Sequence, residues 1–146
     1  LLLLIHKKFQ KWIVPGGHVE QFENQLEAAI REVGEETGIN LNSEDFIPMN
    51  RLVKFPPVAG IKQMIPPVFM FEQEIPAHKG EPPHFHIDHV YIVLCKNDEI
   101  MPSLVALDES QDIKWYSESE IANLEMFQST ADVATYLFKH IKETQH

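Results

Sequence analysis

Apolar and polar positions along this chain follow two periodicities, and each predicts a different kind of element. Residues 1–5 are continuously apolar, as in a buried strand, and residues 12–14 form a second short strand that stops at Pro15-Gly16-Gly17. From Gln25 to Thr37 the apolar residues return every three or four positions, which predicts an amphipathic helix that ends at Gly38. The apolar face of this helix consists of Leu26, Ala29, Ile30, Val33 and Thr37.

The second half of the chain alternates strand and turn signals and closes with helices. Strands are expected at residues 46–55, 68–75, 84–96 and 112–116, and the apolar run 90–95 is typical of a central strand buried on both faces. Ser117 opens a capping box with Glu120, and Ser129 or Thr130 is expected to cap the last helix. The apolar stripe of that helix consists of Ala134, Leu137, Phe138 and Ile141. This order predicts an α/β fold, a mixed β-sheet flanked by helices, in a single domain over residues 1–146.

Charge and cysteine content narrow the classes of protein. The chain of 146 residues carries a formal charge of −10, which argues against a nucleic-acid-binding surface. A small phosphorylated substrate remains compatible, because a bound metal ion can supply local positive charge. One cysteine, Cys95, excludes an internal disulfide and a cysteine-based zinc site, and a reducing, cytoplasmic setting fits. The apolar start is too short for a membrane span, so we expect no membrane association. We also expect the protein to be a monomer or a homodimer.

Three carboxylates crowd the C-terminal end of the first predicted helix, where the helix dipole disfavours them. Glu32, Glu35 and Glu36 fall in its last two turns. Each exposed carboxylate there is unfavourable by roughly 0.3–1 kcal/mol, and Glu32 and Glu36 are also like charges four residues apart. Three such residues indicate a positive partner, and a hard divalent cation with oxygen ligands is the simplest one.

At these residues the sequence resembles the Nudix hydrolase family, whose pattern is G-x5-E-x7-R-E-U-x-E-E-x-G-U, where U is a bulky aliphatic residue. A chance match at a given start is on the order of one in a billion from average residue usage. The pattern is filled without departure by Gly17, Glu23, Arg31, Glu32, Val33, Glu35, Glu36, Gly38 and Ile39.

The resemblance implies a Nudix-type α/β/α sandwich and a metal-dependent pyrophosphohydrolase. Such an enzyme cleaves a nucleoside diphosphate linked to another moiety, as in an NTP, ADP-ribose or a dinucleoside polyphosphate, with Mg²⁺ or Mn²⁺. By the resemblance, Glu32 and Glu36 are the main metal ligands, Glu35 is a further one, and the backbone carbonyl of Gly16 or Gly17 completes the shell. Arg31 and Glu23 are implied as the pair that orients these carboxylates. Glu27 is interpreted as a bystander at the start of the helix.

The general base and the catalytic status stay open at this stage. Glu32 is one candidate base, and Glu74, Glu81 and Glu109 are candidates from later loops. The alternative to an enzyme is a non-catalytic nucleotide-binding or regulatory module on the same fold, and a purely structural acidic domain is the third reading.

A histidine-rich stretch near residue 84 is the second unusual feature. In a strand, His84, His86 and Asp88 point to one face. This row is interpreted as substrate-binding, as hydrogen-bonded core polar groups, or as a second metal site. His18, beside the glycine turn, is a further candidate for contact with substrate phosphate.

Overall fold

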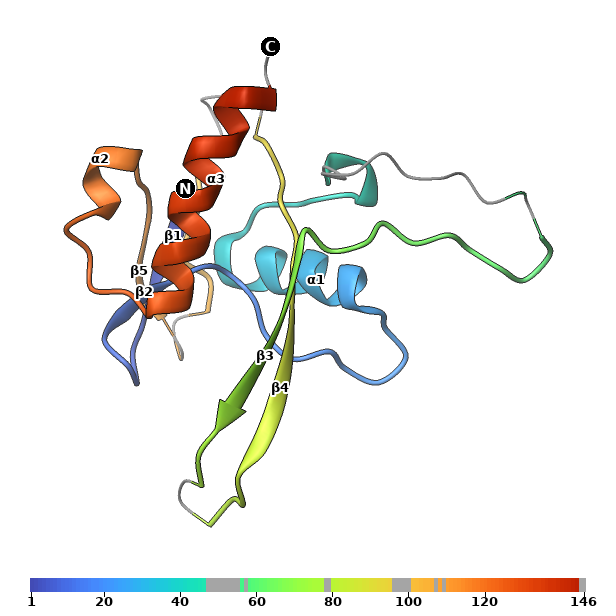
Figure 1. The fold of residues 1–146 in the computed structure, drawn as a ribbon, viewed down its shortest axis with the longest axis horizontal. Coiled ribbons are helices and arrows are strands. Elements are labelled where there is room, and N and C mark those ends of the chain that lie inside the picture. The colour runs from blue at the N-terminus through green and yellow to red at the C-terminus, as the bar shows by residue number, and fades with distance from the viewer. Residues whose placement is uncertain are drawn as a thin grey trace.

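The computed structural model describes residues 1–46, 56, 58–77, 80–95, 101–106, 108 and 110–144, with no side chains beyond residue 141. Figure 1 shows its helices and strands. In chain order they are β1 (Leu2–His6), β2 (Lys11–Ile13), α1 (Gln25–Thr37), the 3₁₀ turn η1 (Ser43–Asp45), β3 (Phe69–Ile75), β4 (His84–Val90), β5 (Ser110–Trp115), α2 (Glu118–Ile121) and α3 (Gln128–Thr144).

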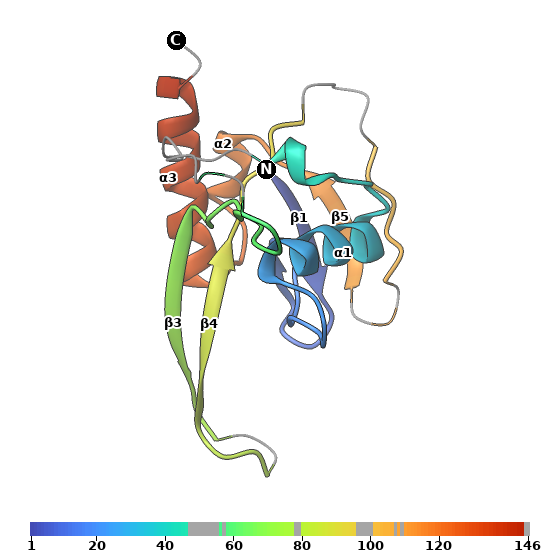
Figure 2. The same cartoon turned by 90° about the vertical axis from the view of Figure 1, so that its right-hand side faces the viewer.

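The centre of the fold is a three-stranded sheet in the order β2-β1-β5. Both of its ladders are antiparallel, with Leu4 opposite Ile13 in one and Ile113 in the other. β1 is the most deeply buried strand, as its apolar run predicts, and Leu3 packs against Ile121 and Ala134 from the two C-terminal helices. Figure 2 shows α1 on one side of this sheet and α3 on the other. The predicted layered α/β class is therefore confirmed.

Helix α1 has the predicted bounds, and both of its ends are capped. Asn24 accepts hydrogen bonds from the backbone N–H groups of Leu26 and Glu27, and the Glu27 carboxylate returns one to the N–H of Asn24. At the other end Gly38 adopts φ 69° and donates its N–H to the carbonyl of Gly34.

The buried face of α1 differs from the predicted stripe. Its buried residues are Leu26, Ala28, Glu36 and Thr37, whereas Ala29, Ile30 and Val33 are half-buried. The segment 103–105 covers the end of the helix, because the N–H groups of Ser103 and Val105 donate to the carbonyls of Thr37 and Glu36. The apolar periodicity could not reveal this cover, because it comes from a distant loop.

β3 and β4 form a separate two-stranded hairpin, which corrects the expectation of a long buried strand over residues 84–96. β4 ends at Val90, and Phe85 and Ile87 are 63% and 51% exposed. β3 is the partner of β4 in this ladder, and Figure 2 shows the hairpin extending away from the rest of the fold. Beyond it Val93 makes an isolated bridge to Phe46. The rest of the strand predicted at residues 46–55 lies outside the described residues.

The C-terminal helices agree with the sequence except at one cap. Ser117 and Glu120 form the predicted capping box of α2. The last helix begins at Gln128, so the expectation that Ser129 or Thr130 caps it is wrong. The N–H of Ala131 already bonds the carbonyl of Phe127, which starts the helix earlier. No helix among the described residues is long and apolar enough to cross a membrane.

Two glycines of the first helix should respond to alanine with opposite signs. Gly38→Ala places a Cβ in left-handed backbone and 2.5 Å from the Ser103 hydroxyl, so the free energy of unfolding should fall by at least about 1–2 kcal/mol. Gly34→Ala, whose Cβ would meet its nearest neighbour at 3.9 Å, should raise it by up to about 1 kcal/mol. Urea denaturation measures both. Equal effects of the two variants would contradict the assigned C-cap.

Candidate active site

The turn after β2 is tied to the far end of α1 by a buried carboxylate. Gly16 donates its N–H to Oε2 of Glu36 at 2.8 Å, and Glu36 is only 6% exposed. A carboxylate buried at the negative end of a helix is costly unless positive or hydrogen-bonding groups surround it. This contact fixes the glycine turn against the helix.

The next residue, Gly17, lies against a second carboxylate of the same helix. A Cβ built on Gly17 would overlap the side-chain carboxylate of Glu32. Only glycine therefore allows the backbone to approach Glu32 so closely. Two successive glycines thus bring main chain to Glu36 and to Glu32.

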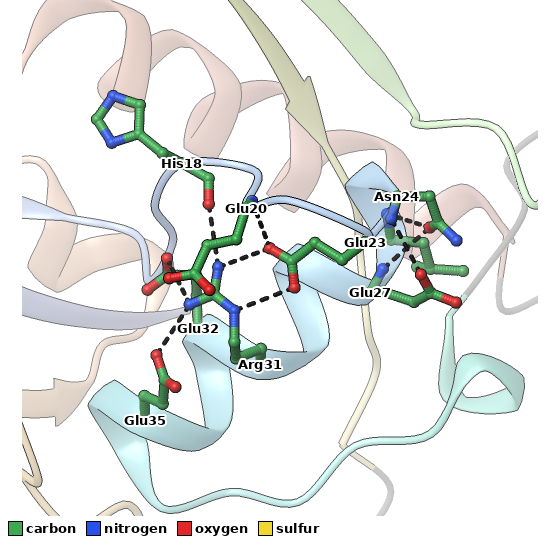
Figure 3. Close-up of polar contacts among 9 residues, drawn as sticks. His18, Glu20, Glu23, Asn24, Glu27, Arg31, Glu32 and Glu35 are labelled. Atoms are coloured by element: carbon green, nitrogen blue, oxygen red, sulfur yellow. Dashed lines mark hydrogen bonds and ion pairs between the residues drawn. The ribbon is translucent and has the colours of Figure 1, made fainter.

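Arg31 connects the remaining parts of the site, as Figure 3 shows. Its Nη2 and Nε bind the two carboxylate oxygens of Glu23 at 2.8 and 3.1 Å, which is the two-pronged geometry that guanidinium groups favour. Its Nη1 lies 2.9 Å from both Glu32 Oε1 and Glu35 Oε2. Nη2 also donates to the backbone carbonyl of His18 at 3.0 Å. One side chain therefore orders the glycine turn, the segment before the helix and two helix carboxylates.

These contacts shift two pKa values in opposite directions. The hydrogen bonds from Arg31 hold the pKa of Glu23 below its ordinary value, and the N–H of Glu20 adds to this effect. The same hydrogen bonds, which Glu23 accepts, raise the pKa of Arg31, so the guanidinium stays charged at every accessible pH.

The helix carboxylates and the glycine turn line one cavity of about 340 Å³. Four carboxylates and one guanidinium leave this cavity with a net charge of −3 when His18 is neutral. A cavity of this charge favours cations over phosphate oxygens unless a cation binds first. Its lining consists of Gly16, Gly17, His18, Glu20, Arg31, Glu32, Glu35, Glu36 and Ala106.

The donor set fits a hard divalent cation in chemistry, though the side chains are not arranged around one. All acidic donors are oxygens, and Gly17 leaves room for backbone beside Glu32. In the part of the chain that the structure describes, no group of three or more acidic, histidine or cysteine side chains is placed to hold a metal ion. Arg31 engages Glu32 and Glu35, while Glu36 faces Gly16. The predicted metal role of these carboxylates and Gly17 stays a prediction.

The other candidate residues divide between the cavity and the hairpin. His18 lines the cavity, but in Figure 3 its ring points away from the carboxylates while its carbonyl faces Arg31. His84 and His86 lie together on β4, and the exposed Asp88 follows on the same strand. The strand alternation predicted this shared face, and the substrate role of these residues stays a prediction.

Of the alternative general bases, Glu74 and Glu81 are exposed and do not line the cavity, while Glu109 lies outside the described residues.

The structure adds two cavity residues that the sequence reading did not single out, Glu20 and Ala106. Glu20 lies in a turn closed by its own N–H, which bonds Glu23 Oε1 at 2.8 Å. Its place between Gly17 and Glu23 was the available signal, but a loop has no periodicity that fixes where a side chain points.

Comparison with known proteins agrees with this geometry. The NUDIX domain profile matches residues 1–137, and the chain belongs to the Nudix family. A curated relative, the m7GpppN-mRNA hydrolase NUDT17 of Danio rerio, is 53% identical over 34 residues. That match takes in 23% of this chain and 11% of the relative.

Solved structures extend the likeness to nearly the whole chain. A hydrolase of the NUDIX family from Clostridium perfringens is 28% identical with a TM-score of 0.68, over 96% of this chain and 88% of that one. A second structure is a bifunctional NMN adenylyltransferase/ADP ribose pyrophosphatase from Francisella tularensis, complexed with AMP and a Mn ion. It is 26% identical with a TM-score of 0.60, over 95% of this chain and 37% of that one. A C. elegans Ap4A hydrolase shares the fold, at 18% identity and a TM-score of 0.58, over 97% of this chain and 85% of that one.

The ion pair between Arg31 and Glu23 should make stability depend on pH. Because the folded pKa of Glu23 lies below its ordinary value of 4.5, its stabilisation is present above that pH and is lost as the pH falls through the folded pKa. Glu23→Gln should therefore lower the free energy of unfolding at pH 7, and the difference from wild type should shrink below pH about 4. Urea denaturation from pH 7 to pH 3 measures this.

Glu72→Gln on the exposed strand β3 is the control for the loss of one negative charge. A gap between wild type and Glu23→Gln that stays constant down to pH 3, or that Glu72→Gln reproduces, would contradict the assigned ion pair.

Proposed function

We propose that this chain is a metal-dependent pyrophosphohydrolase that cleaves a nucleoside diphosphate linked to a second moiety. The main observation in support is that three helix carboxylates and two glycines of the preceding turn line one cavity of net negative charge. A hard cation in that cavity would neutralise it and attract a diphosphate, whereas the protein charge alone repels one.

Glu32 and Glu36 are the main metal ligands of this proposal, Glu35 is a further ligand, and Gly17 offers its backbone carbonyl. The metal is Mg²⁺, or Mn²⁺ in its place, since oxygen donors suit both. When bound, it would neutralise charge on the diphosphate oxygens and lower the pKa of the attacking water.

The protein residues then have separable tasks. Arg31 and Glu23 are positioning residues, because they hold Glu32, Glu35 and the carbonyl of His18 in place. Gly16 orients Glu36 through its N–H. Glu20 and Glu32 are the candidates for accepting the proton of the attacking water, since both line the cavity.

The family and the comparisons support the proposed substrate class. The Danio rerio relative is named for hydrolysis of m7GpppN-mRNA, and the Francisella tularensis structure is titled an ADP ribose pyrophosphatase with bound AMP. The m7GpppN cap and ADP-ribose each contain a nucleoside diphosphate linked to another group. NTPs, ADP-ribose and dinucleoside polyphosphates are therefore the substrates that we propose to test first, in preference to nucleic acid as such, because the chain carries a charge of −10.

Glu36→Gln separates an enzyme from a binding module. Glutamine keeps an oxygen that accepts the N–H of Gly16 but removes the buried charge, so the fold should remain. With Mg²⁺ and a panel of nucleoside diphosphate derivatives, turnover of the best substrate should fall at least about a hundredfold, since metal stabilisation of the transition state is worth several kcal/mol. Coupled phosphate release measures the rate.

Glu27→Gln is the matched control on the same helix. Glutamine keeps the capping-box contact to Asn24 and removes an exposed charge, so turnover should stay at the wild-type level. Absence of turnover across the panel with both Mg²⁺ and Mn²⁺, together with tight nucleotide binding, would replace the enzyme with the non-catalytic module.

A further inference from the structure

Three imidazoles gather where the glycine turn meets the β3–β4 hairpin. His84 and His86 lie on the same face of β4, and their Nε2 atoms are 3.2 Å apart. The ring of His18 is edge-on to that of His86, with 5.5 Å between the centroids. The pair therefore lies next to His18, which is one of the residues that line the acidic cavity.

The hydrogen bonds of His84 define its neutral form. Its Nδ1 lies 3.0 Å from the carbonyl oxygen of Pro82, which can only accept a hydrogen bond, so Nδ1 carries the proton. Nε2 of His84 therefore presents a lone pair toward His86. Metal-binding histidines are commonly held in this way, with the second ring nitrogen donating to a backbone carbonyl.

The spacing of the two nitrogens matches a shared metal ion. Two imidazole nitrogens that each lie about 2.0–2.1 Å from one tetrahedral zinc ion are separated by about 3.3 Å. The observed separation is 3.2 Å, and both rings present the same nitrogen, Nε2. We propose that His84 and His86 bind a borderline transition-metal ion of the zinc class through their Nε2 atoms.

This site differs from the carboxylate cavity in its ligands and in its metal. Imidazole suits Zn²⁺, Ni²⁺, Cu²⁺ and Co²⁺, whereas Mg²⁺ takes oxygen donors. Among the described residues no group of three such side chains is placed to hold a metal, so His84 and His86 are the ligands that this part of the chain supplies. Water or an exchangeable ligand fills the other positions. Before the ion binds, the Nε2–H group of His86 donates a hydrogen bond to Nε2 of His84. When the ion binds, His86 changes tautomer, so that its ring proton lies on its own Nδ1.

Calorimetry would measure the binding of Zn²⁺ to the untagged, chelator-treated chain of residues 1–146 in the presence of millimolar Mg²⁺. Wild-type protein should bind Zn²⁺, and His84→Gln and His86→Gln should each weaken this binding at least about tenfold. The magnitude follows because losing even a hydrogen-bond partner of a metal-bound histidine costs about 10–100-fold in affinity. Co²⁺ in place of Zn²⁺ should give ligand-field absorption bands that both variants lose.

His89→Gln is the matched control, because His89 lies on the same strand but on its opposite face, paired with Met70. Its affinity for Zn²⁺ should equal that of wild type, and circular dichroism should show every variant folded. Three results would overturn the proposal: no Zn²⁺ bound, which means a hydrogen-bonded histidine pair only; displacement of Zn²⁺ by Mg²⁺, which places it among the carboxylates; or equal loss in His89→Gln.

Discussion

The guanidinium of Arg31 is the constraint on which the rest of the site depends. It is bonded to Glu23, to Glu32, to Glu35 and to the carbonyl of His18 at distances of 2.8–3.1 Å. These partners belong to the glycine turn, the segment before α1 and the last turns of α1. Lysine has a single point charge and could not span them, because the planar fork of arginine sets both the directions and the number of contacts.

The second constraint is excess negative charge. One arginine cannot balance the four carboxylates that line the cavity, and Glu36 is buried against the end of its own helix. Hydrogen bonding from Gly16 offsets part of that cost. The remaining negative charge favours the binding of a cation, and a divalent metal ion would neutralise it. The proposed chemistry and the cost to stability thus arise from the same residues.

Helix α1 and most residues of the candidate site could be predicted from the sequence, because the patterns that indicate them are local in the chain. Periodicity and the Gly38 cap predicted a helix over about Gln25 to Thr37, which agrees with α1, and the family pattern named Glu23, Arg31 and the helix carboxylates. Strand alternation placed His84 and His86 on one face. The extent of the single domain stays a prediction.

The features that could not be predicted from the sequence depend on tertiary contacts. The apolar run after His89 predicted a central strand, but β4 ends at Val90 and, among the described residues, pairs with β3 in a hairpin outside the central sheet. A run of apolar residues does not report how many partners a strand finds. Burial of Glu36 and the place of Glu20 likewise follow from a distant loop and a turn, which no periodicity encodes.

We expect the carboxylates of α1 to hold a divalent cation beside the glycine turn. Anomalous diffraction from crystals of the protein grown with Mn²⁺ and Mg²⁺-free buffer tests it most directly. An anomalous peak is expected within ligand distance of Glu32 and Glu36, with Arg31 still bound to Glu23. A peak elsewhere on the chain, or none at saturating Mn²⁺, would contradict it.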